Sequence, residues 1–252
     1  MKSLRTALAT GRPLLGLCNM YPAPGMLERI AADWDWVWID GQHGEMGYQD
    51  MLAAVRACNL VGVPTIVRVP GHEFGSIGQA LDMGSSGVLV PVVDTVEEAL
   101  GVVKAAKFPP LGGRSYGGRR PVDRHGRLYA DTANEDTLLI CQIESPEAVD
   151  NAERIAAVPG VDGLFIGPDD LLLRRGRKMD EPRTPELLKP DMERVIRACQ
   201  RHGKIGCMVG MGDGMLKLCL SMGYQMVVAG GDVPFLANGS RQAAAEARQV
   251  VA

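Results

Sequence analysis

Eight short apolar segments, separated by stretches with helical periodicity, constrain the fold of this chain more than any other feature. They occupy residues 14–18, 36–39, 65–69, 87–90, 138–143, 162–166, 205–209 and 225–229. They are apolar at nearly every position, which is typical of strands covered on both faces. Eight such strands alternating with helices predict a single (β/α)8 TIM barrel over residues 1–252, a fold that commonly uses about 250 residues. An open dinucleotide-binding sheet is disfavoured, because no GxGxxG sequence follows the first strand.

The segments between the strands differ greatly in length. Amphipathic stretches at 48–61, 95–106, 191–201 and 214–222 predict helices, and a final helix is expected over 234–250. Residues 109–136, rich in Gly and Arg, and residues 174–190, rich in basic residues, are much longer connections. Long connections are often functional loops or interface segments. We expect the first to follow strand four and the second strand six, so both are predicted on the catalytic face as lids or subunit contacts.

Charge and cysteine content indicate which kinds of partner and which cellular compartment the protein is suited to. The chain has 27 Lys and Arg against 30 Asp and Glu, a formal net charge of -3, which gives no electrostatic reason to bind nucleic acid or a membrane surface. No apolar run approaches the ~18 residues of a membrane span, and the first residues lack the apolar core of a signal peptide. The six cysteines form no CxxC pair, which is typical of free thiols in a reducing compartment. We therefore expect a cytoplasmic protein with a small-molecule partner.

Two carboxylate side chains are predicted at the carboxyl ends of strands five and six. Strand five ends in Glu144, and the segment after strand six brings Asp170. Both are oxygen donors with no Cys or paired His beside them, which favours Mg²⁺ or Mn²⁺ over structural zinc. Two carboxylates leave open positions that the carboxylate and keto oxygens of a 2-oxo acid can fill. Capping of the following helix explains either residue alone equally well, but their joint occurrence favours the metal.

The turn that contains Asp170, Gly167-Pro168-Asp169-Asp170, has a second use. A helix that starts there would direct backbone N–H groups and its positive dipole end at a substrate carboxylate. Proline at the start of a helix is also common for structural reasons, so this signal alone is weak.

Two further strand ends carry groups suited to oxyanion and proton chemistry. Arg68 in strand three stays cationic and would hydrogen-bond an enolate or keto oxygen as charge develops. An internal ion pair with Asp82 or Asp40 is the alternative, and it would also orient the guanidinium. His43 follows strand two and is the candidate proton-transfer residue, with Asp40 positioned to fix its tautomer.

Seven motifs, taken together and in this order, resemble a known family. They are W-V-W-I-D-G-Q-H, V-R-V, L-D-M-G, V-P-V-V-D-T, F-P-P-L-G-G-R, Q-I-E-S and I-G-P-D-D-L. From about Gly16 to Asp232 the chain is similar to the HpcH/HpaI aldolases, which are class II metal-dependent pyruvate aldolases. Examples are 4-hydroxy-2-oxoheptanedioate, 2-dehydro-3-deoxyglucarate and 2-keto-3-deoxy-L-rhamnonate aldolase. The resemblance implies reversible retro-aldol cleavage of a 4-hydroxy-2-oxo acid to pyruvate, or a close analogue, and an aldehyde.

The resemblance also implies roles for individual residues. The metal ligands are Glu144 and Asp170; the residues of proton and enolate chemistry are His43, Arg68, Asp40 and Asp82; the substrate-binding residues are Arg68, Gln142, Gly167, Pro168 and Asp169. The metal would be Mg²⁺ or Mn²⁺, with Co²⁺ a third candidate. Members of the family typically assemble as homo-hexamers, trimers of dimers, in which the last helix is exchanged between neighbouring barrels.

Other functions stay open at this point. An acyl-CoA lyase of the citramalyl or malyl type shares the barrel and the carboxylate–metal chemistry, and a non-catalytic carboxylate-binding barrel could keep the pocket without turnover. A Schiff-base aldolase is disfavoured, because none of the seven lysines is expected at the carboxyl end of a strand. Of the remaining histidines, His72 and His125 would reach the mouth only from loops. The basic segment 174–190 would recognise an acidic or polyhydroxylated aldehyde together with Arg114, Arg119, Arg120, Arg124 and Arg127. A solvated or intersubunit Arg-rich face is the favoured alternative.

Overall fold

The computed structural model describes residues 3–181, 184–212 and 214–251, and it confirms the predicted barrel. The strands are β1 (Leu14–Asn19), β2 (Trp36–Asp40), β3 (Thr65–Arg68), β4 (Gly87–Val90), β5 (Leu138–Ile143), β6 (Gly163–Ile166), β7 (Ile205–Val209) and β8 (Met226–Gly231). All neighbours pair in parallel, and β8 pairs with β1, so the sheet closes on itself in chain order. All eight predicted strands are present, with ends shifted by at most two residues.

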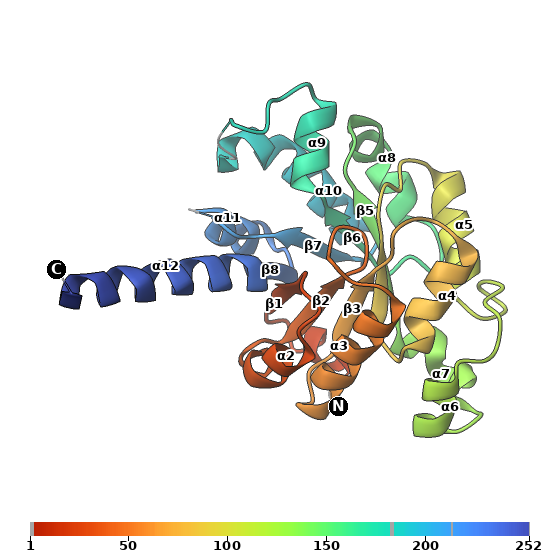
Figure 1. Cartoon of the computed structure of the whole chain (residues 1–252). Coiled ribbons are helices and arrows are strands. Elements are labelled where there is room, and N and C mark those ends of the chain that lie inside the picture. The colour runs from red at the N-terminus through yellow and green to blue at the C-terminus, as the bar shows by residue number, and fades with distance from the viewer. Residues whose placement is uncertain (1–2, 182–183, 213, 252) are drawn as a thin grey trace.

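Helices connect and surround these strands (Figure 1). They are α1 (Leu4–Leu8), α2 (Pro24–Ile30), the 3-10 turn η1 (Ala31–Asp33), α3 (Tyr48–Leu60), α4 (Phe74–Asp82), α5 (Val96–Ala106), α6 (Arg119–His125), α7 (Tyr129–Asp136), α8 (Pro146–Ala156), α9 (Pro168–Arg174), α10 (Pro185–Arg201), α11 (Met215–Met222) and α12 (Asp232–Val251). The predicted helices at 48–61, 95–106, 191–201, 214–222 and 234–250 are confirmed. The helix predicted at 191–201 starts six residues earlier, at Pro185.

Two apolar clusters explain why the sheet closes. One fills the barrel interior with large side chains such as Trp36, Trp38 and Phe165, and Leu4 of α1 belongs to it. The other lies between the outer faces of the strands and the helices, which is why the strands read as apolar on both faces. Gly16 has no room for a side chain, since a Cβ there would lie 2.4 Å from the Trp36 ring.

The long segment 109–136 lies at the opposite end of the barrel from its predicted place. It follows α5 and leads into β5, so the chain has already returned to the amino-terminal ends of the strands. There it forms α6 and α7, at the lower right of Figure 1. The prediction of a lid on the catalytic face is therefore wrong for this segment. Segment 174–190 does follow β6 and α9, as predicted, although residues 182–183 within it lie outside the described residues.

The last helix, α12, leaves the barrel as a straight rod (Figure 1). Its first residue, Asp232, is fully buried and accepts hydrogen bonds from the Asn19 side chain and from the backbone N–H groups of Met20 and Tyr21, at 2.8–2.9 Å. The carboxylate thus ties the start of α12 to the end of β1. Farther along, the helix exposes apolar side chains such as Phe235 and Leu236. No helix in the described part of the chain is both long and apolar enough to cross a membrane.

Candidate active site

Four strand ends bring charged side chains to one mouth of the barrel, as predicted. Asp40 ends β2, Arg68 ends β3, Glu144 follows β5 and Asp170 lies in the first turn of α9, after β6. In the β2–β3 register Asp40 lies directly beside Arg68. Asp40 and Glu144 are each 1% exposed and Arg68 is 6% exposed. Charges buried this deeply must be paired or bound to a ligand.

Arg68 is held from two sides. Its Nε and Nη2 atoms donate to the two carboxylate oxygens of Asp40 at 2.8 and 2.5 Å, and its guanidinium lies 4.6 Å from the centre of the Trp38 ring. Burial tends to raise the pKa of Asp40, but the hydrogen bonds and charge of Arg68 outweigh it and hold that pKa below its usual value. Asp40 is therefore ionised, and the Nη1 atom of Arg68 takes no part in the pair.

His43 lies in the turn after β2, and its side chain is exposed. Asp40 accepts the backbone N–H groups of Gln42 and His43 at 3.0 and 3.2 Å. The prediction that Asp40 fixes the tautomer of the His43 ring is not what the geometry shows. The Asp40 carboxylate instead holds the backbone of the turn that carries His43. Its two oxygens also accept hydrogen bonds from Arg68.

Asp82 does not reach the mouth. It ends α4, at the opposite end of the barrel, where Arg114 donates to its carboxylate at 2.6 Å. The prediction that Asp82 lies near Arg68 is therefore wrong. The physical reason is the direction of α4, whose nine residues carry the chain about 13 Å away from the mouth at ~1.5 Å per residue.

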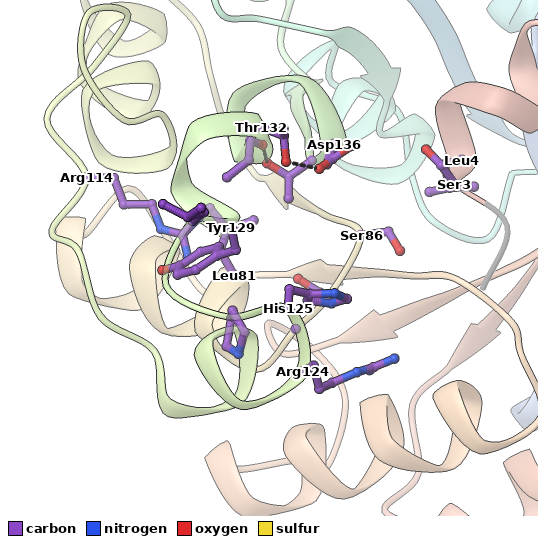
Figure 2. Close-up of a pocket in the computed structure, with 16 residues that line it drawn as sticks. Ser3, Leu4, Leu81, Ser86, Arg114, Arg124, His125, Tyr129, Thr132 and Asp136 are labelled. Atoms are coloured by element: carbon purple, nitrogen blue, oxygen red, sulfur yellow. Dashed lines mark hydrogen bonds between the residues drawn. The ribbon is translucent and has the colours of Figure 1, made fainter.

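A cavity of about 450 Å³ lies at this far end, between α6, α7 and the start of the chain (Figure 2). Arg114, Arg124 and His125 contribute to its lining. The arginines of segment 109–136 and His125 are thus far from the mouth of their own barrel, and none recognises a substrate there. Arg114 is occupied by Asp82, and Arg119 forms an ion pair with Asp123 one turn along α6.

Glu144 is a buried carboxylate held at both oxygens. Oε1 accepts the backbone N–H of Val92 at 2.7 Å, and Oε2 accepts the Gln142 side-chain amide. Burial raises the pKa of Glu144 against the lowering effect of the Val92 hydrogen bond, and the nearby Asp170 charge raises it further. The helix-cap explanation fails for Glu144, because Ser145 caps α8 by accepting the Ala148 N–H.

Gly167 lets the β6–α9 turn approach these groups closely. A Cβ on Gly167 would lie 2.3 Å from Glu144 Oε2 and 2.6 Å from Gln142 Nε2. The N–H of Gly167 donates to the Ile143 carbonyl at 3.1 Å, and Pro168 has no N–H. Gly167 and Pro168 therefore shape the turn, and any carboxylate-binding N–H groups must come from the residues that follow them.

The peptide that supports Glu144 has a strained backbone, which the sequence did not indicate. Val92, after β4, has a φ of 54°. This left-handed conformation is unusual for a β-branched residue and costs of order 1–3 kcal/mol. Strain of this kind persists where surrounding contacts determine the backbone. Here the contact is with Glu144, through the Val92 N–H.

The donor set at the mouth fits a hard divalent cation. Two neighbouring carboxylates, one of them buried with a raised pKa, are stabilised by a positive charge between them. Within the described ranges no group of three or more His, Cys, Asp and Glu side chains could hold a metal. Glu144 and Asp170 are the two carboxylates at the mouth that would hold the cation. Gln142 Oε1 is buried with no partner in the described structure, and a ligand donor would satisfy it.

Comparison with known proteins identifies the family to which the chain is similar. A model of the HpcH/HpaI aldolase/citrate lyase family matches residues 23–239. The chain is 41% identical over 180 residues to 4-hydroxy-2-oxovalerate aldolase of Novosphingobium aromaticivorans, which covers 70% of this chain and 68% of that protein. It is 35% identical over 249 residues to hydroxypyruvate/pyruvate aldolase of Cupriavidus necator, covering 97% and 92%.

A solved structure of similar size shares the whole fold. The crystal structure of the HpcH/HpaI aldolase from Desulfitobacterium hafniense superposes with a TM-score of 0.88 at 26% identity, over 98% of this chain and 97% of that one. The motifs, the closed barrel and the sequence matches all point the same way. The chain belongs to the HpcH/HpaI aldolase/citrate lyase family.

Proposed function

We propose that the protein is a class II, divalent-metal-dependent aldolase, a carbon–carbon lyase. It would catalyse reversible retro-aldol cleavage of a 4-hydroxy-2-oxo acid to pyruvate, or a close analogue, and an aldehyde. The observation that carries this proposal is the buried Glu144 beside Asp170, at the same mouth as Arg68. The names of the relatives, 4-hydroxy-2-oxovalerate aldolase and hydroxypyruvate/pyruvate aldolase, support the same reaction class.

Glu144 and Asp170 would hold the metal, Mg²⁺ or Mn²⁺ with Co²⁺ a third candidate. A bound ion would supply Lewis-acid stabilisation of the enolate. Arg68 would donate from Nη1 to the keto oxygen, where negative charge develops as the carbon–carbon bond breaks. Because Asp40 and Trp38 already fix the guanidinium, little reorganisation is needed during the reaction.

The substrate carboxylate would lie against the first turn of α9, next to Gly167. The missing side chain of Gly167 leaves room there, and the first-turn N–H groups of a helix favour an anion. Gln142 would donate or accept beside it from β5, and Asp169 would line the same turn. The aldehyde half would extend toward solvent, where His43 is exposed. His43 would exchange the proton of the C4 hydroxyl through water.

We also propose that the enzyme is a cytoplasmic homo-oligomer, a hexamer built as a trimer of dimers with α12 exchanged between barrels. The exposed apolar side chains of α12 support an assembly of this kind, because single chains rarely leave a long helix so poorly covered. Six free, buried cysteines are consistent with a reducing compartment.

Pyruvate release from a panel of 4-hydroxy-2-oxo acids tests the reaction, with and without EDTA. We expect EDTA to abolish release and Mg²⁺ or Mn²⁺ to restore it. Activity that resists EDTA would contradict the metal mechanism. Release of acetyl-CoA from malyl-CoA or citramalyl-CoA, with no pyruvate from any 4-hydroxy-2-oxo acid, would indicate an acyl-CoA lyase. Binding of pyruvate with no turnover on any substrate would indicate a carboxylate-binding barrel.

A further inference from the structure

His72 contacts the peptide that supports Glu144. It lies in the loop between β3 and α4, where it is half-buried. Its Nε2 atom is 2.8 Å from the carbonyl oxygen of Pro91. Since a carbonyl oxygen only accepts, Nε2 must carry the proton, whichever charge state the ring has.

The Pro91 carbonyl and the Val92 N–H are two ends of one planar peptide group. His72 donates to the oxygen end at 2.8 Å, and the nitrogen end donates to Glu144 Oε1 at 2.7 Å. A hydrogen bond at one end of a peptide polarises it and strengthens the hydrogen bond at the other end. Because the group is planar, fixing the carbonyl direction also fixes the direction of the N–H.

This peptide needs external support. Its Val92 side has a φ of 54°, a conformation that an L-valine leaves readily when nothing holds it. The next residue, Val93, is fixed by donating its N–H to the Gln142 carbonyl at 3.1 Å. The Val93 bond lies within the β4–β5 pair. His72 holds the Pro91–Val92 peptide from outside that pair, from the loop between β3 and α4.

We propose that His72 is a positioning residue for Glu144, holding the Pro91–Val92 peptide so that its N–H fixes one oxygen of this carboxylate. The inference rests on the proposed function, in which Glu144 binds the metal. Groups that orient a metal ligand are typically worth about 10- to 100-fold in metal affinity or activity. His72 would therefore tune metal binding without touching metal or substrate.

Three variants test the inference. In His72→Ala the donor is lost, and we expect the dissociation constant for Mn²⁺, measured by calorimetry on metal-free protein, to rise about tenfold. Amide hydrogen exchange of peptides covering Val92 should accelerate in the same variant. His72→Gln keeps an N–H near the position of Nε2 and should restore both readouts to within about threefold of wild type. His125→Ala, at the opposite end of the barrel, is the matched control and should change neither.

The kinetic readout separates positioning from general damage. The Mn²⁺ concentration for half-maximal activity should rise about tenfold in His72→Ala, while KM for the 2-oxo acid at saturating Mn²⁺ stays near that of wild type. Unchanged Mn²⁺ affinity and unchanged exchange at Val92 would overturn the inference. If wild type and Glu144→Gln bind Mn²⁺ alike, the proposed metal site fails instead, and the exchange rate at Val92 then decides alone whether His72 holds this peptide.

Discussion

Replacing Arg68 by lysine separates charge from geometry at the mouth. Arg68 uses Nε and Nη2 to hold Asp40 at 2.8 and 2.5 Å, and the proposed mechanism assigns Nη1 to the keto oxygen. A lysine keeps the positive charge but has a single ammonium group, which cannot serve Asp40 and the substrate in the same geometry. The variant should therefore fold with its buried charges still balanced and lose the donor for the developing oxyanion.

The magnitude follows from what is lost. Removing one preorganised oxyanion donor costs about 3–4 kcal/mol of transition-state stabilisation, or roughly 100- to 1000-fold in kcat. Breaking a buried ion pair outright would cost about 3–5 kcal/mol of folding free energy. Since lysine can still pair with Asp40, which is 1% exposed, we expect the loss in unfolding free energy to stay below that range.

Pyruvate release coupled to NADH oxidation by lactate dehydrogenase measures kcat, and chemical denaturation measures stability. Arg12→Lys is a matched control, because Arg12 also forms a two-pronged pair with an aspartate, Asp35, but its side chain is 58% exposed. Surface pairs of this kind contribute about 0–1 kcal/mol, so both readouts should stay near wild type. If Arg68→Lys kept more than about a tenth of wild-type kcat, Arg68 would not be the oxyanion donor.

Three further perturbations probe the site, its electrostatics and the assembly. Gly167→Ala places a Cβ 2.3 Å from Glu144 Oε2. Calorimetry should show weaker Mn²⁺ binding, and chemical denaturation should show an unfolding free energy lower by about 1–3 kcal/mol because of overpacking. Unchanged Mn²⁺ binding would contradict the close approach. The folded pKa of Asp40 lies below the ordinary 3.8, so its pairing stabilises the fold above that pH and this stabilisation is lost as the pH falls through the folded pKa. The thermal unfolding temperature, measured between pH 7 and 3, should accordingly fall less steeply with decreasing pH for Asp40→Asn than for wild type. Parallel plots of this temperature against pH for the two proteins would refute the lowered pKa of Asp40. Deleting residues 238–252 should reduce the assembly size in light scattering while circular dichroism stays barrel-like; an unchanged mass would argue against exchange of α12.

The sequence predicted the barrel well, because strands buried on both faces leave a direct trace in the chain as short apolar runs. Segment 109–136 was placed at the wrong end for an equally physical reason. Its length suggested a functional loop, but length does not say at which end of the barrel a connection lies. The helix at 96–106 comes first and returns the chain to the amino-terminal end, so the order of elements was the better guide.

The site could be predicted only in part. Side chains that end strands, such as Arg68 and Glu144, were found because strand ends in a barrel converge at one mouth. The partners of these side chains were harder to predict. The ion-pair partner of Arg68 was left open between Asp82 and Asp40, and the neighbouring strand supplies Asp40 in direct register. The strained backbone at Val92 left no trace in the sequence, because valine normally avoids positive φ and only the tertiary contacts of this residue favour it.

In the proposed assembly, the anchoring of α12 would couple subunit contacts to the mouth of the barrel. Asp232 joins the seam between β8 and β1, since it starts the helix and accepts three hydrogen bonds from Asn19, Met20 and Tyr21. A rod about 30 Å long acts as a lever on that seam. In the proposed assembly, a force on the far end of α12 would reach the rim at β1 through these hydrogen bonds. If the proposed assembly forms, a subunit that loses its neighbours should therefore also lose rigidity beside its own mouth.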